Sequence, residues 1–529
     1  MGHAMRVAKA VEVLTADGAL DARLVVPEDM DPGAVARTVV TDVTYDSRAV
    51  RPGALFVCKG AAFKPAYLAD AVARGAVACL SEHEPDASVP AIVVRDVRRA
   101  MAELACAFFG EPSRRLRVVG ITGTKGKTTT AYYVDAILRA RAPRAGVAPR
   151  SGMFTGLVID DGMARRPSHN TTPESVELQR HLANAVDAGC DVVVMEASSQ
   201  GLKYDRTLGT RFAVGMFTNI GEDHISPIEH PTFQDYFASK LRIFAQSDVA
   251  VVNVRSDHAD EILRAAHAAC PRVVTYDPQV PEGQAPAAPM ADVRLVEATR
   301  RGLARWDLAI ATPRDPVRLA FAALGAYNVQ NAVAAVAACE VLGVSHDAMA
   351  RGLREVRVPG RGELHRSPDG AVVGVIDYAH NEMSMRALLG AVREEFPDRQ
   401  VTVVFGSCGT RGLDRRAGLG RAAGELADRV ILTEDEPDTA RVADVCAEIG
   451  RAVTAAGGAY EVVERREEAI RRAVDGAARP AAVVIAGKGA ETTMLRNRVD
   501  EPYGPDARVF CEVVGAPYEG EGPAAGAAR

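Results

Sequence analysis

The sequence has no apolar run long enough to cross a lipid bilayer, although 48% of its 529 residues are hydrophobic. Its first residues, MGHAMR, do not lead into the apolar centre of a secretory signal. It also has no excess of basic residues, and a formal net charge of −6 argues against a nucleic-acid-binding protein. We therefore expect a cytoplasmic protein that binds neither membranes nor nucleic acids.

The sequence lacks any close Cys-x-x-Cys pair, and its nine cysteines are an odd number. This spacing excludes a disulfide framework and a zinc site built from paired cysteines. A reducing compartment is therefore expected. The cysteines are scattered at positions 58, 79, 106, 190, 270, 339, 408, 446 and 511.

A chain of this length is too long for one hydrophobic core, so several domains are expected. Short apolar runs alternate with helical patterns throughout, which predicts an α/β protein. We predict a central, mainly parallel sheet with a phosphate-binding loop, flanked by two smaller α/β domains. Turn-rich residues at 109–113 and 359–361 mark the boundaries. The predicted ranges are 1–112, 113–358, 359–514 and a disordered tail at 515–529.

Residues 120–130, which read GITGTKGKTTT, follow an apolar run at 116–119 and precede a helical pattern. The sequence therefore reads as strand, glycine turn and helix, and the helix has one apolar face: Ala131, Val134, Ile137 and Leu138. In such a loop backbone N–H groups surround phosphate, Lys127 reaches the terminal phosphates and Thr128 ligates Mg²⁺. This pattern predicts binding of a nucleoside triphosphate.

The spacing departs from the general phosphate-loop pattern, because Ile121 stands five residues before Gly126. A glycine-rich turn with a solvated lysine is the alternative. The strand before the loop and the helix after it favour phosphate binding. The other candidates in the loop are Gly123, Thr124 and Thr129.

Glu196 follows the buried strand predicted at 192–195, at the end where ligands bind in open α/β sheets. A carboxylate there is suited to Mg²⁺, although it could instead cap a helix. His224 follows another predicted strand, at 213–219, and Lys240 lies in a predicted helix at 233–244. Taken singly, a structural histidine and a solvated lysine are the simpler interpretations. We expect Lys240 at the helix surface, where its replacement by alanine costs little stability.

Asn328 and Asn331 are three residues apart, so they share one face of a helix. An amide pair there could recognise adenine or phosphate-linked groups. A helix cap and a surface amide are the alternatives. Two further motifs follow, PGRGE at 359–363 and DYAH at 377–380.

In their order along residues 120–380, these motifs resemble the ATP-binding signatures of the Mur ligase family. The resemblance implies the family's three-domain fold, ATP and two Mg²⁺ ions. It also implies that Lys127 is catalytic, and that Thr128, Glu196, His224 and a carbamylated Lys240 form the metal site. Contacts to ATP are implied for Asn328, Arg361, Asp377 and His380.

Residues 46–48, which read DSR, resemble the uridine-nucleotide domain of the family members that add the third peptide residue to the peptidoglycan precursor. The motif HNTTP at 169–173 and the residues near 198 and 206 resemble their contacts to UDP-N-acetylmuramoyl-L-alanyl-D-glutamate. The implied residues are Ser47, Arg48, Asn170, Thr171, Thr172, Ser198 and Arg206. Gln200 departs from the histidine of many members, and residues 61–67 replace a common Asp-Gly-His segment.

The residues 435–438, which read DEPD, stand where members that use meso-diaminopimelate carry Asp-Asn-Pro-Arg. At an effective dielectric constant of about 20, charge repulsion from an aspartate about 4 Å from the distal carboxylate of that substrate would cost about 4 kcal/mol of binding free energy. L-Lysine presents only an ammonium there, which Glu436, Asp438 and Glu491 could hold. We expect L-lysine, with ornithine and diaminopimelate as alternatives, and the implied acceptor residues are Asp435, Glu436, Asp438, Gly487 and Glu491.

The resemblance implies a monomeric acid–amino-acid ligase that activates a carboxylate as an acyl phosphate in peptidoglycan precursor synthesis. Closure of the third domain on the second is expected, with a hinge near 357–360. A phosphate-loop motor or switch ATPase without an acceptor is the alternative of another class. Folylpolyglutamate synthetase shares the central chemistry but should lack the uridine-nucleotide domain.

Overall fold

The computed structural model describes residues 3–16, 18–60, 63–85, 88–143, 146–223, 225–226, 229–279, 291–354, 356–518 and 520. The chain forms two compact units, which are described separately. Unit 1 consists of residues 1–277, 287–293 and 334–349, and unit 2 consists of residues 278–286, 294–333 and 350–529.

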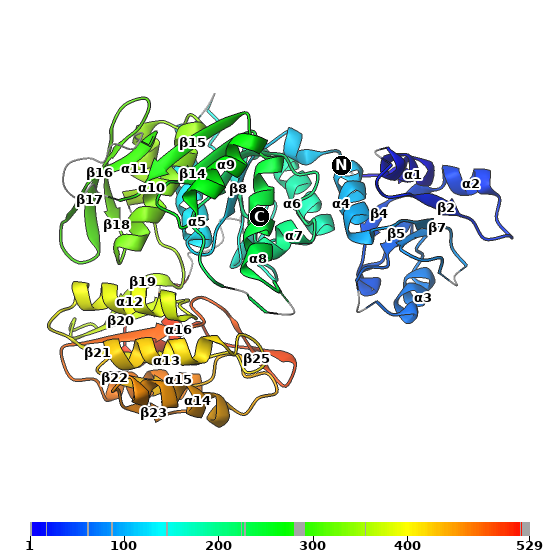
Figure 1. The fold of residues 1–529 in the computed structure, drawn as a ribbon. Helices are drawn as coiled ribbons and strands as arrows, with labels where there is room; N and C mark the ends of the chain where they lie inside the picture. Colours follow the sequence, from blue (N-terminus) through cyan, green and yellow to red (C-terminus); the bar gives the residue numbers. More distant parts are fainter. Residues whose placement is uncertain are drawn as a thin grey trace. The chain divides into compact units, whose positions relative to one another are not determined.

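The first part of unit 1 is built around a sheet with the strand order β2-β7-β6-β5-β4 (Figure 1). The strands are parallel except for β2, which runs antiparallel to β7. Helices α1 and α4 pack on one face, and α3 packs on the other. The bounds are α1 (Val7–Thr15), β2 (Arg23–Val25), β4 (Asp42–Thr44), β5 (Ala54–Val57), α3 (Pro65–Ala73), β6 (Ala78–Ser81), β7 (Ala91–Val93) and α4 (Val97–Phe108).

The second part of unit 1 contains the parallel strands β9-β12-β8-β13-β14-β15, and the antiparallel strands β10 and β11 lie beside β9. Every residue of β12 is buried, which explains its continuous apolar sequence. The strands predicted at 192–195 and 213–219 are confirmed as β12 and β13. The bounds are β8 (Arg117–Thr122), β9 (Ser151–Phe154), β10 (Val158–Asp160), β11 (Arg165–Pro167), β12 (Val192–Glu196), β13 (Phe212–Phe217), β14 (Val249–Asn253) and β15 (Arg272–Asp277).

The helices of this part cover the sheet with the apolar faces that the sequence predicted. In α5 (Lys127–Arg139) the predicted apolar face is buried. The helix predicted at 233–244 is shorter, because α8 (Phe233–Leu241) passes into a 3₁₀ turn at Arg242–Gln246. The aromatic side chains of Tyr236, Phe237 and Phe244 still pack into one core with α6 (Ser175–Asp187) and α9 (Ala259–Ala269).

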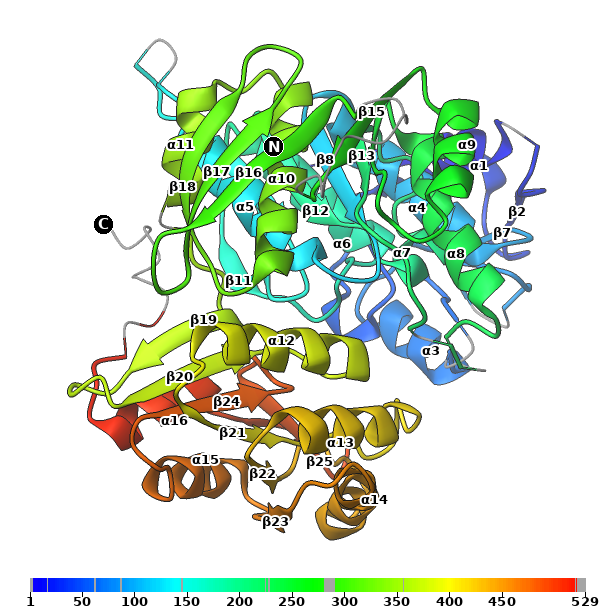
Figure 2. The same ribbon diagram turned by 60° about the vertical axis from the view of Figure 1, so that its left-hand side comes forward.

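Unit 2 has a sheet with the order β19-β20-β24-β21-β22-β23, in which β19 alone runs antiparallel to its neighbour. Helices α12, α13 and α14 cover one face, and α15 and α16 cover the other (Figure 2). The bounds are β19 (Arg361–Arg366), β20 (Val372–Asp377), α12 (Glu382–Glu395), β21 (Gln400–Phe405), α13 (Arg415–Leu426), β22 (Arg429–Leu432), α14 (Val442–Ala455), β23 (Tyr460–Val462), α15 (Arg466–Asp475), β24 (Ala481–Ala486) and α16 (Asp506–Val514).

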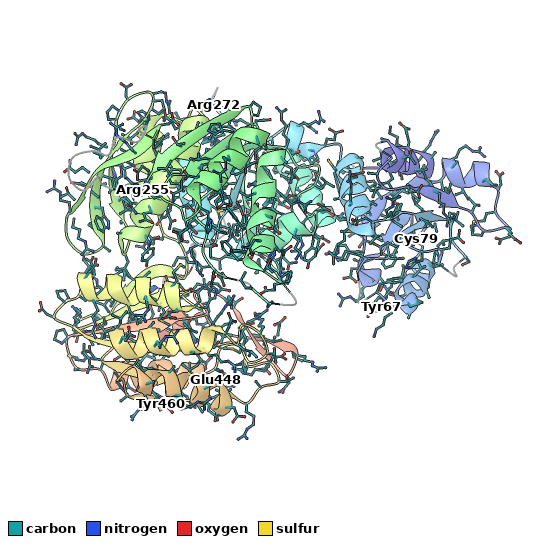
Figure 3. The ribbon with its side chains drawn as sticks, viewed as in Figure 1. Tyr67, Cys79, Arg255, Arg272, Glu448 and Tyr460 are labelled. Carbon is teal, nitrogen blue, oxygen red and sulfur yellow. The ribbon has the colours of Figure 1, made fainter. Side chains whose placement is uncertain are left out.

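Two antiparallel elements complete unit 2. Strands β16 (Val293–Arg300), β17 (Arg305–Ala311) and β18 (Val317–Ala322) form one of them. Strands β25 (Thr493–Arg496) and β26 (Val499–Pro502) form a hairpin. Tyr460, labelled in Figure 3, is exposed because β23 is the edge strand of the larger sheet.

No helix in the described part of the chain is long and apolar enough to span a membrane. The predicted boundary at 112 falls in a 3₁₀ turn at Pro112–Arg114, and the boundary at 358 lies just before β19. Both boundaries stay predictions. Of the predicted disordered tail, residues 519 and 521–529 lie outside the described residues.

Candidate functional site

The phosphate-binding loop joins β8 to α5 and depends on two glycines in unusual conformations. Gly123 has a φ of +148° and Gly126 has a φ of +82°. A Cβ atom on Gly123 would lie 2.0 Å from Oγ1 of Thr218 at the end of β13. The loop is therefore packed against the neighbouring strand so closely that only glycine fits.

Two lysines converge on the carbonyl oxygen of Gly123. Nζ of Lys127 donates to this oxygen at 2.8 Å and to the Thr124 carbonyl at 3.2 Å. Nζ of Lys240 donates to the same Gly123 oxygen at 2.8 Å. Lys240 therefore lies beside the loop, although it comes from α8 and is more than a hundred residues away in sequence.

The expectation that Lys240 lies at the helix surface is wrong, because its side chain is only 1% exposed. Burial in the interior lowers the pKa of Lys240 well below its usual value, and the neighbouring charge of Lys127 adds to this effect. A buried lysine with a lowered pKa spends more time as the neutral amine, which is its nucleophilic form. The tip also lies over the ring of Tyr236, with Nζ 4.5 Å from the ring centroid.

Thr128 and Glu196 meet directly. The hydroxyl of Thr128 donates to Oε1 of Glu196 at 2.8 Å, and the Gly156 N–H donates to the same oxygen at 2.9 Å. Glu196 is buried at the end of β12. A hydroxyl and a carboxylate are oxygen ligands of the kind that Mg²⁺ prefers, so this pair fits the ion.

His224, the remaining predicted metal ligand, lies outside the described residues. Among the residues that are described, no group of three His, Cys, Asp or Glu side chains is arranged around a common point for a metal. Of the predicted set, the structure thus joins Thr128 to Glu196 and places Lys240 beside the same loop.

The other threonines of the loop serve different contacts. Oγ1 of Thr124 lies 3.0 Å from the hydroxyl of Tyr236 and accepts from the Gly221 N–H at 3.1 Å. Thr129 is buried within the first turn of α5. These contacts tie the loop to α8 and to the segment after β13.

Asn219 and Asp223 also contact the loop, and the sequence did not single them out. Oδ1 of Asn219 accepts from the Lys125 N–H at 2.8 Å, and Oδ2 of Asp223 lies 3.2 Å from Nζ of Lys125. The available signal was their place in the segment 218–223, just beyond a predicted strand.

Thr172, Ser198 and Arg206 form a second predicted group near the loop. Oγ1 of Thr172 donates to the Glu196 carbonyl at 2.9 Å and accepts from the Ser198 N–H at 2.9 Å. Nη1 of Arg206 donates to the Thr172 carbonyl at 3.1 Å. These predicted substrate-binding residues are therefore linked through the Glu196 backbone to the predicted metal site.

Asn170 and Thr171 lie just before this group, where Asn170 is exposed and Thr171 is half-buried. A Cβ atom on Gly156 would lie 3.4 Å from Oγ1 of Thr171 and 3.9 Å from Oε1 of Glu196. Thr171 therefore borders the carboxylate that Gly156 contacts.

Ser47 and Arg48 belong to a 3₁₀ turn at Ser47–Ala49 in the first part of unit 1. The Arg48 guanidinium pairs with the Asp46 carboxylate at 2.9 Å. A hydrogen bond from Ser47 lowers the pKa of Asp70. The turn thus presents polar groups at the end of β4, and its nucleotide contacts stay a prediction.

Glu174 is a buried carboxylate that the sequence analysis missed. It lies between two cations, with Oε1 2.9 Å from Nη2 of Arg206 and Oε2 3.0 Å from Nζ of Lys59. Nζ of Lys59 also lies 3.8 Å from the ring centroid of Tyr45. The signal was its place directly after the motif at 169–173.

In unit 2, the residues predicted to bind the nucleoside also come together. Asn328 is buried, and its Nδ2 donates to the Leu324 carbonyl at 2.9 Å. A Cβ atom on Gly362 would lie 3.6 Å from this Nδ2 atom. The Gly362 N–H donates to Oδ2 of Asp377 at 2.7 Å.

Arg361 and His380 flank the ring of Tyr378. The Arg361 guanidinium lies 4.2 Å from the ring centroid, and the two aromatic rings contact edge to face at 4.8 Å. Nδ1 of His380 also lies 2.8 Å from the Tyr378 carbonyl oxygen. The predicted residues of PGRGE and DYAH therefore form one group, centred on a tyrosine that the sequence did not single out.

The predicted acceptor residues surround Lys488, which the sequence analysis missed. Its side chain is fully buried, and Nζ lies 3.0 Å from Oε1 of Glu436 and 2.7 Å from Oε2 of Glu491. The three carboxylates of Asp435, Glu436 and Glu491 raise the pKa of Lys488 above its usual value. Glu436 and Glu491, which are predicted to hold the ammonium group of the substrate, are thus already paired with the ammonium group of Lys488.

Asp435 is buried next to this group, and desolvation is the largest cause that raises its pKa to about 6. A Cβ atom on Gly487, which has a φ of +110°, would lie 2.2 Å from Oδ2 of Asp435. Asp438 is half-buried and has a different partner, since its Oδ2 accepts from the Thr410 hydroxyl at 3.0 Å. The cluster carries more negative than positive side chains and suits a cationic amino acid.

Comparison with known proteins identifies two family models in this chain. Residues 121–339 match the Mur ligase middle domain, and residues 360–489 match the Mur ligase glutamate ligase domain. The first match begins within the phosphate-binding loop and includes Asn328, and the second includes the residues of unit 2 from Arg361 to Lys488.

Relatives of similar length match nearly the whole chain. A UDP-N-acetylmuramoyl-L-alanyl-D-glutamate–L-lysine ligase from Enterococcus faecalis is 38% identical over 474 residues, which is 88% of this chain and 90% of that protein. A ligase of the same name from Streptococcus pyogenes is 35% identical, over 88% of this chain and 91% of that protein. A solved UDP-N-acetylmuramoyl-L-alanyl-D-glutamate–2,6-diaminopimelate ligase is similar with a TM-score of 0.62 and 25% identity, over 97% of this chain and 99% of that one.

Proposed function

The chain belongs to the Mur ligase family, and from this premise we propose that it is an ATP-dependent ligase that joins L-lysine to UDP-N-acetylmuramoyl-L-alanyl-D-glutamate in peptidoglycan precursor synthesis. The observation that carries the proposal is the near-complete match to an L-lysine ligase at 38% identity. The contacts among Gly123, Lys127, Thr128, Glu196 and Lys240 are consistent with it.

The ligase uses ATP because a carboxylate and an amine otherwise form an unreactive salt. The γ-phosphoryl group passes to the D-glutamyl carboxylate, which becomes an acyl phosphate, and ADP leaves. The α-amine of lysine then attacks the acyl carbon, an amide bond forms and phosphate is expelled. The covalent changes take place within the substrates, so the protein contributes by positioning the substrates and by stabilising charge.

Lys127 and the N–H groups of its loop are the proposed partners of the phosphates. In the structure the Lys127 ammonium bonds to loop carbonyls, so it needs only a side-chain rotation to reach an anion placed over the loop. The N-terminus of α5 supplies further positive potential at the same place.

Thr128 and Glu196 are the proposed Mg²⁺ ligands, together with His224. Family membership implies ATP and Mg²⁺, and the bound ion supplies neutralisation of the phosphoryl charge. We propose that two ions bind and that Lys240 is carbamylated. Its burial supports this modification, because a neutral amine is the form that can add carbon dioxide.

The acceptor group in unit 2 is proposed to select L-lysine by charge. The four carboxylates of Asp435, Glu436, Asp438 and Glu491 outnumber the two cations that pair with them, Lys488 and Arg411. A substrate with a second carboxylate is therefore disfavoured, and one with a second ammonium is favoured. The relatives from Enterococcus faecalis and Streptococcus pyogenes are both named as L-lysine ligases.

The proposal is tested by phosphate release from ATP in the presence of UDP-N-acetylmuramoyl-L-alanyl-D-glutamate and each candidate amino acid. Rapid release is expected only when L-lysine and the nucleotide are both present. Release that needs diaminopimelate or ornithine but not lysine would overturn the acceptor. Release without any acceptor would favour a switch or motor ATPase.

A further inference from the structure

The loop that carries the acceptor carboxylates has an unusual backbone. It follows β22, and two of its residues that are not glycine have positive φ angles, +50° at Glu436 and +52° at Asp438. Side chains with a Cβ atom rarely adopt this conformation, so contacts outside the loop must hold it.

The hairpin β25–β26 provides backbone contacts to this loop. The Asp438 N–H donates to the Leu495 carbonyl at 3.0 Å, and the Asn497 N–H donates to the Asp438 carbonyl at 2.9 Å. The Arg498 N–H donates to Oδ1 of Asp438 at 3.0 Å. Figure 1 shows this hairpin as an orange-red ribbon at the β25 label.

The turn of the hairpin is itself shaped for these contacts. Asn497 and Arg498 have φ angles of +50° and +65°, as in a two-residue type I′ turn. Arg498 occupies the second position, where glycine is the usual residue. The turn and the acceptor loop therefore both contain residues with a left-handed backbone conformation, and hydrogen bonds join Asn497 and Arg498 of the turn to Asp438 of the loop.

Two side chains of the hairpin bond to the loop: Sδ of Met494 accepts from the Glu436 N–H at 3.3 Å, and Arg496 binds the base of the loop. Its Nε and Nη2 atoms donate to the two carboxylate oxygens of Glu434, at 2.9 and 2.7 Å. Glu434 is only 4% exposed and directly precedes Asp435. Nη1 of Arg496 bonds to Glu501 on β26 at 2.6 Å. Such a two-pronged bond fixes direction as well as distance.

We propose that Arg496 is a positioning residue for amino-acid selection: its fork to Glu434 holds the β25–β26 hairpin against residues 434–438 and so presents their carboxylates to the acceptor. The proposal rests on the proposed function of the same site. Arg496 itself need not touch the acceptor, and the phosphate-binding loop belongs to a different unit.

The test compares steady-state kinetics of the full-length wild-type enzyme, Arg496→Ala and Arg496→Lys. In Arg496→Ala the KM for L-lysine should rise about tenfold or more, because the carboxylates lose their fixed direction. The KM values for ATP and for the UDP-dipeptide should stay within about twofold, since the Arg496 side chain bonds to Glu434 and Glu501 and not to the residues proposed to bind those substrates. Arg496→Lys, which keeps one charged contact, should recover part of the lysine affinity.

Arg508→Ala is the matched control, since Arg508 forms an exposed pair with Glu512 on α16. It should leave all three KM values unchanged. If Arg496→Ala does not fold, Glu434→Gln, which keeps the side-chain shape and removes its charge, should raise the KM for lysine in the same way.

A folded Arg496→Ala enzyme with an unchanged KM for lysine would overturn the proposal. An equal rise in all three KM values would also overturn it, because that result indicates a general structural role. Failure of the proposed function is distinguishable, since the wild-type enzyme itself would then show no lysine-dependent phosphate release.

Discussion

Lys240 is the residue whose environment differs most from its sequence expectation. Because it is buried and its pKa is lowered, the side chain resists carrying its charge in the folded protein. Replacement by methionine, of similar length, removes the proposed carbamate of the metal site and should lower turnover by about 100-fold or more. Activity under saturating substrates measures this effect, and near-normal turnover would remove Lys240 from the site.

The stability of Lys240→Met should differ from that of the wild type in a pH-dependent way. Below the usual lysine pKa, the unfolded chain binds a proton that the folded protein binds less well. Burial of Lys240 therefore destabilises the wild type most at low pH. The free energy of unfolding of the wild type rises as the pH approaches the usual lysine pKa. The advantage of Lys240→Met in urea unfolding should shrink as the pH rises, and a constant difference would contradict the account.

Asp435 gives the opposite pH dependence. Burial raises its pKa to about 6, so between about pH 4 and 6 the folded protein holds a proton that the unfolded chain has lost. The contribution of Asp435 to stability therefore falls as the pH rises through this window. Asp435→Asn should unfold like the wild type near pH 4 and be up to about 3 kcal/mol more stable near pH 7. Equal stability at both pH values would show that Asp435 is not desolvated.

Asp438 tests the charge selection of the acceptor. Asp438→Arg introduces a cation where the proposed function requires repulsion of a second carboxylate. The kcat/KM for L-lysine should fall about tenfold or more, and the kcat/KM for meso-diaminopimelate should rise relative to it. Asp444→Arg, at an exposed position of α14, should change neither value. An unchanged ratio in Asp438→Arg would contradict selection by charge at this residue.

Sequence reasoning at this scale located residues by motif but not by burial or pairing. The rule that ligands bind at the carboxyl ends of parallel strands singled out Glu196 as a magnesium ligand, and the structure adds its contact with Thr128. Lys488 could not be found in this way, because one of its two partners, Glu436, comes from a different loop 52 residues away in sequence. The interior position of Lys240 depends on how α8 packs, which the helical pattern alone does not specify.

At the scale of elements, the phosphate-binding loop depends on its approach to β13. Gly123→Ala would place a Cβ atom against Thr218 and add strain at a φ of +148°. It should lower the unfolding free energy by about 2 kcal/mol or more and abolish ATP binding. Calorimetric titration with ATP and urea unfolding measure the two effects.

Gly390→Ala provides the control for this substitution. Gly390 lies within α12, and a Cβ atom there would meet no atom within 4 Å. Because alanine favours the helix, stability should be unchanged or about 0.5–1 kcal/mol higher, with normal activity. A similar loss in both variants would show that the tight packing at Gly123 is not the cause.

The elements that the sequence predicted most reliably are the buried parallel strands. Continuous apolar runs such as β12 and β24 can only be satisfied inside a sheet that is covered on both faces. The predicted end of α8, at residue 244, lies beyond the observed end at Leu241. The apolar pattern continues to Phe244, although the backbone has already tightened into a 3₁₀ turn. A turn of this kind keeps the side chains on the same face and leaves the pattern unchanged.

At the scale of the whole molecule, the proposed reaction needs both compact units. The loop and the metal residues belong to unit 1, whereas the nucleoside and acceptor residues from Arg361 to Glu491 belong to unit 2. The family resemblance implies three domains, with ATP bound by the second and the amino acid by the third, and this division of tasks stays a prediction. The structure adds that each group is internally bonded, so each unit can present its residues as a preformed set.

The most direct test is to incubate the purified protein with ATP, Mg²⁺, UDP-N-acetylmuramoyl-L-alanyl-D-glutamate and an equal mixture of L-lysine and meso-diaminopimelate, and to weigh the nucleotide product by mass spectrometry. We expect a product heavier by one lysine residue, formed with one phosphate released per product. A product that carries diaminopimelate, or phosphate release without any heavier nucleotide, would contradict this expectation.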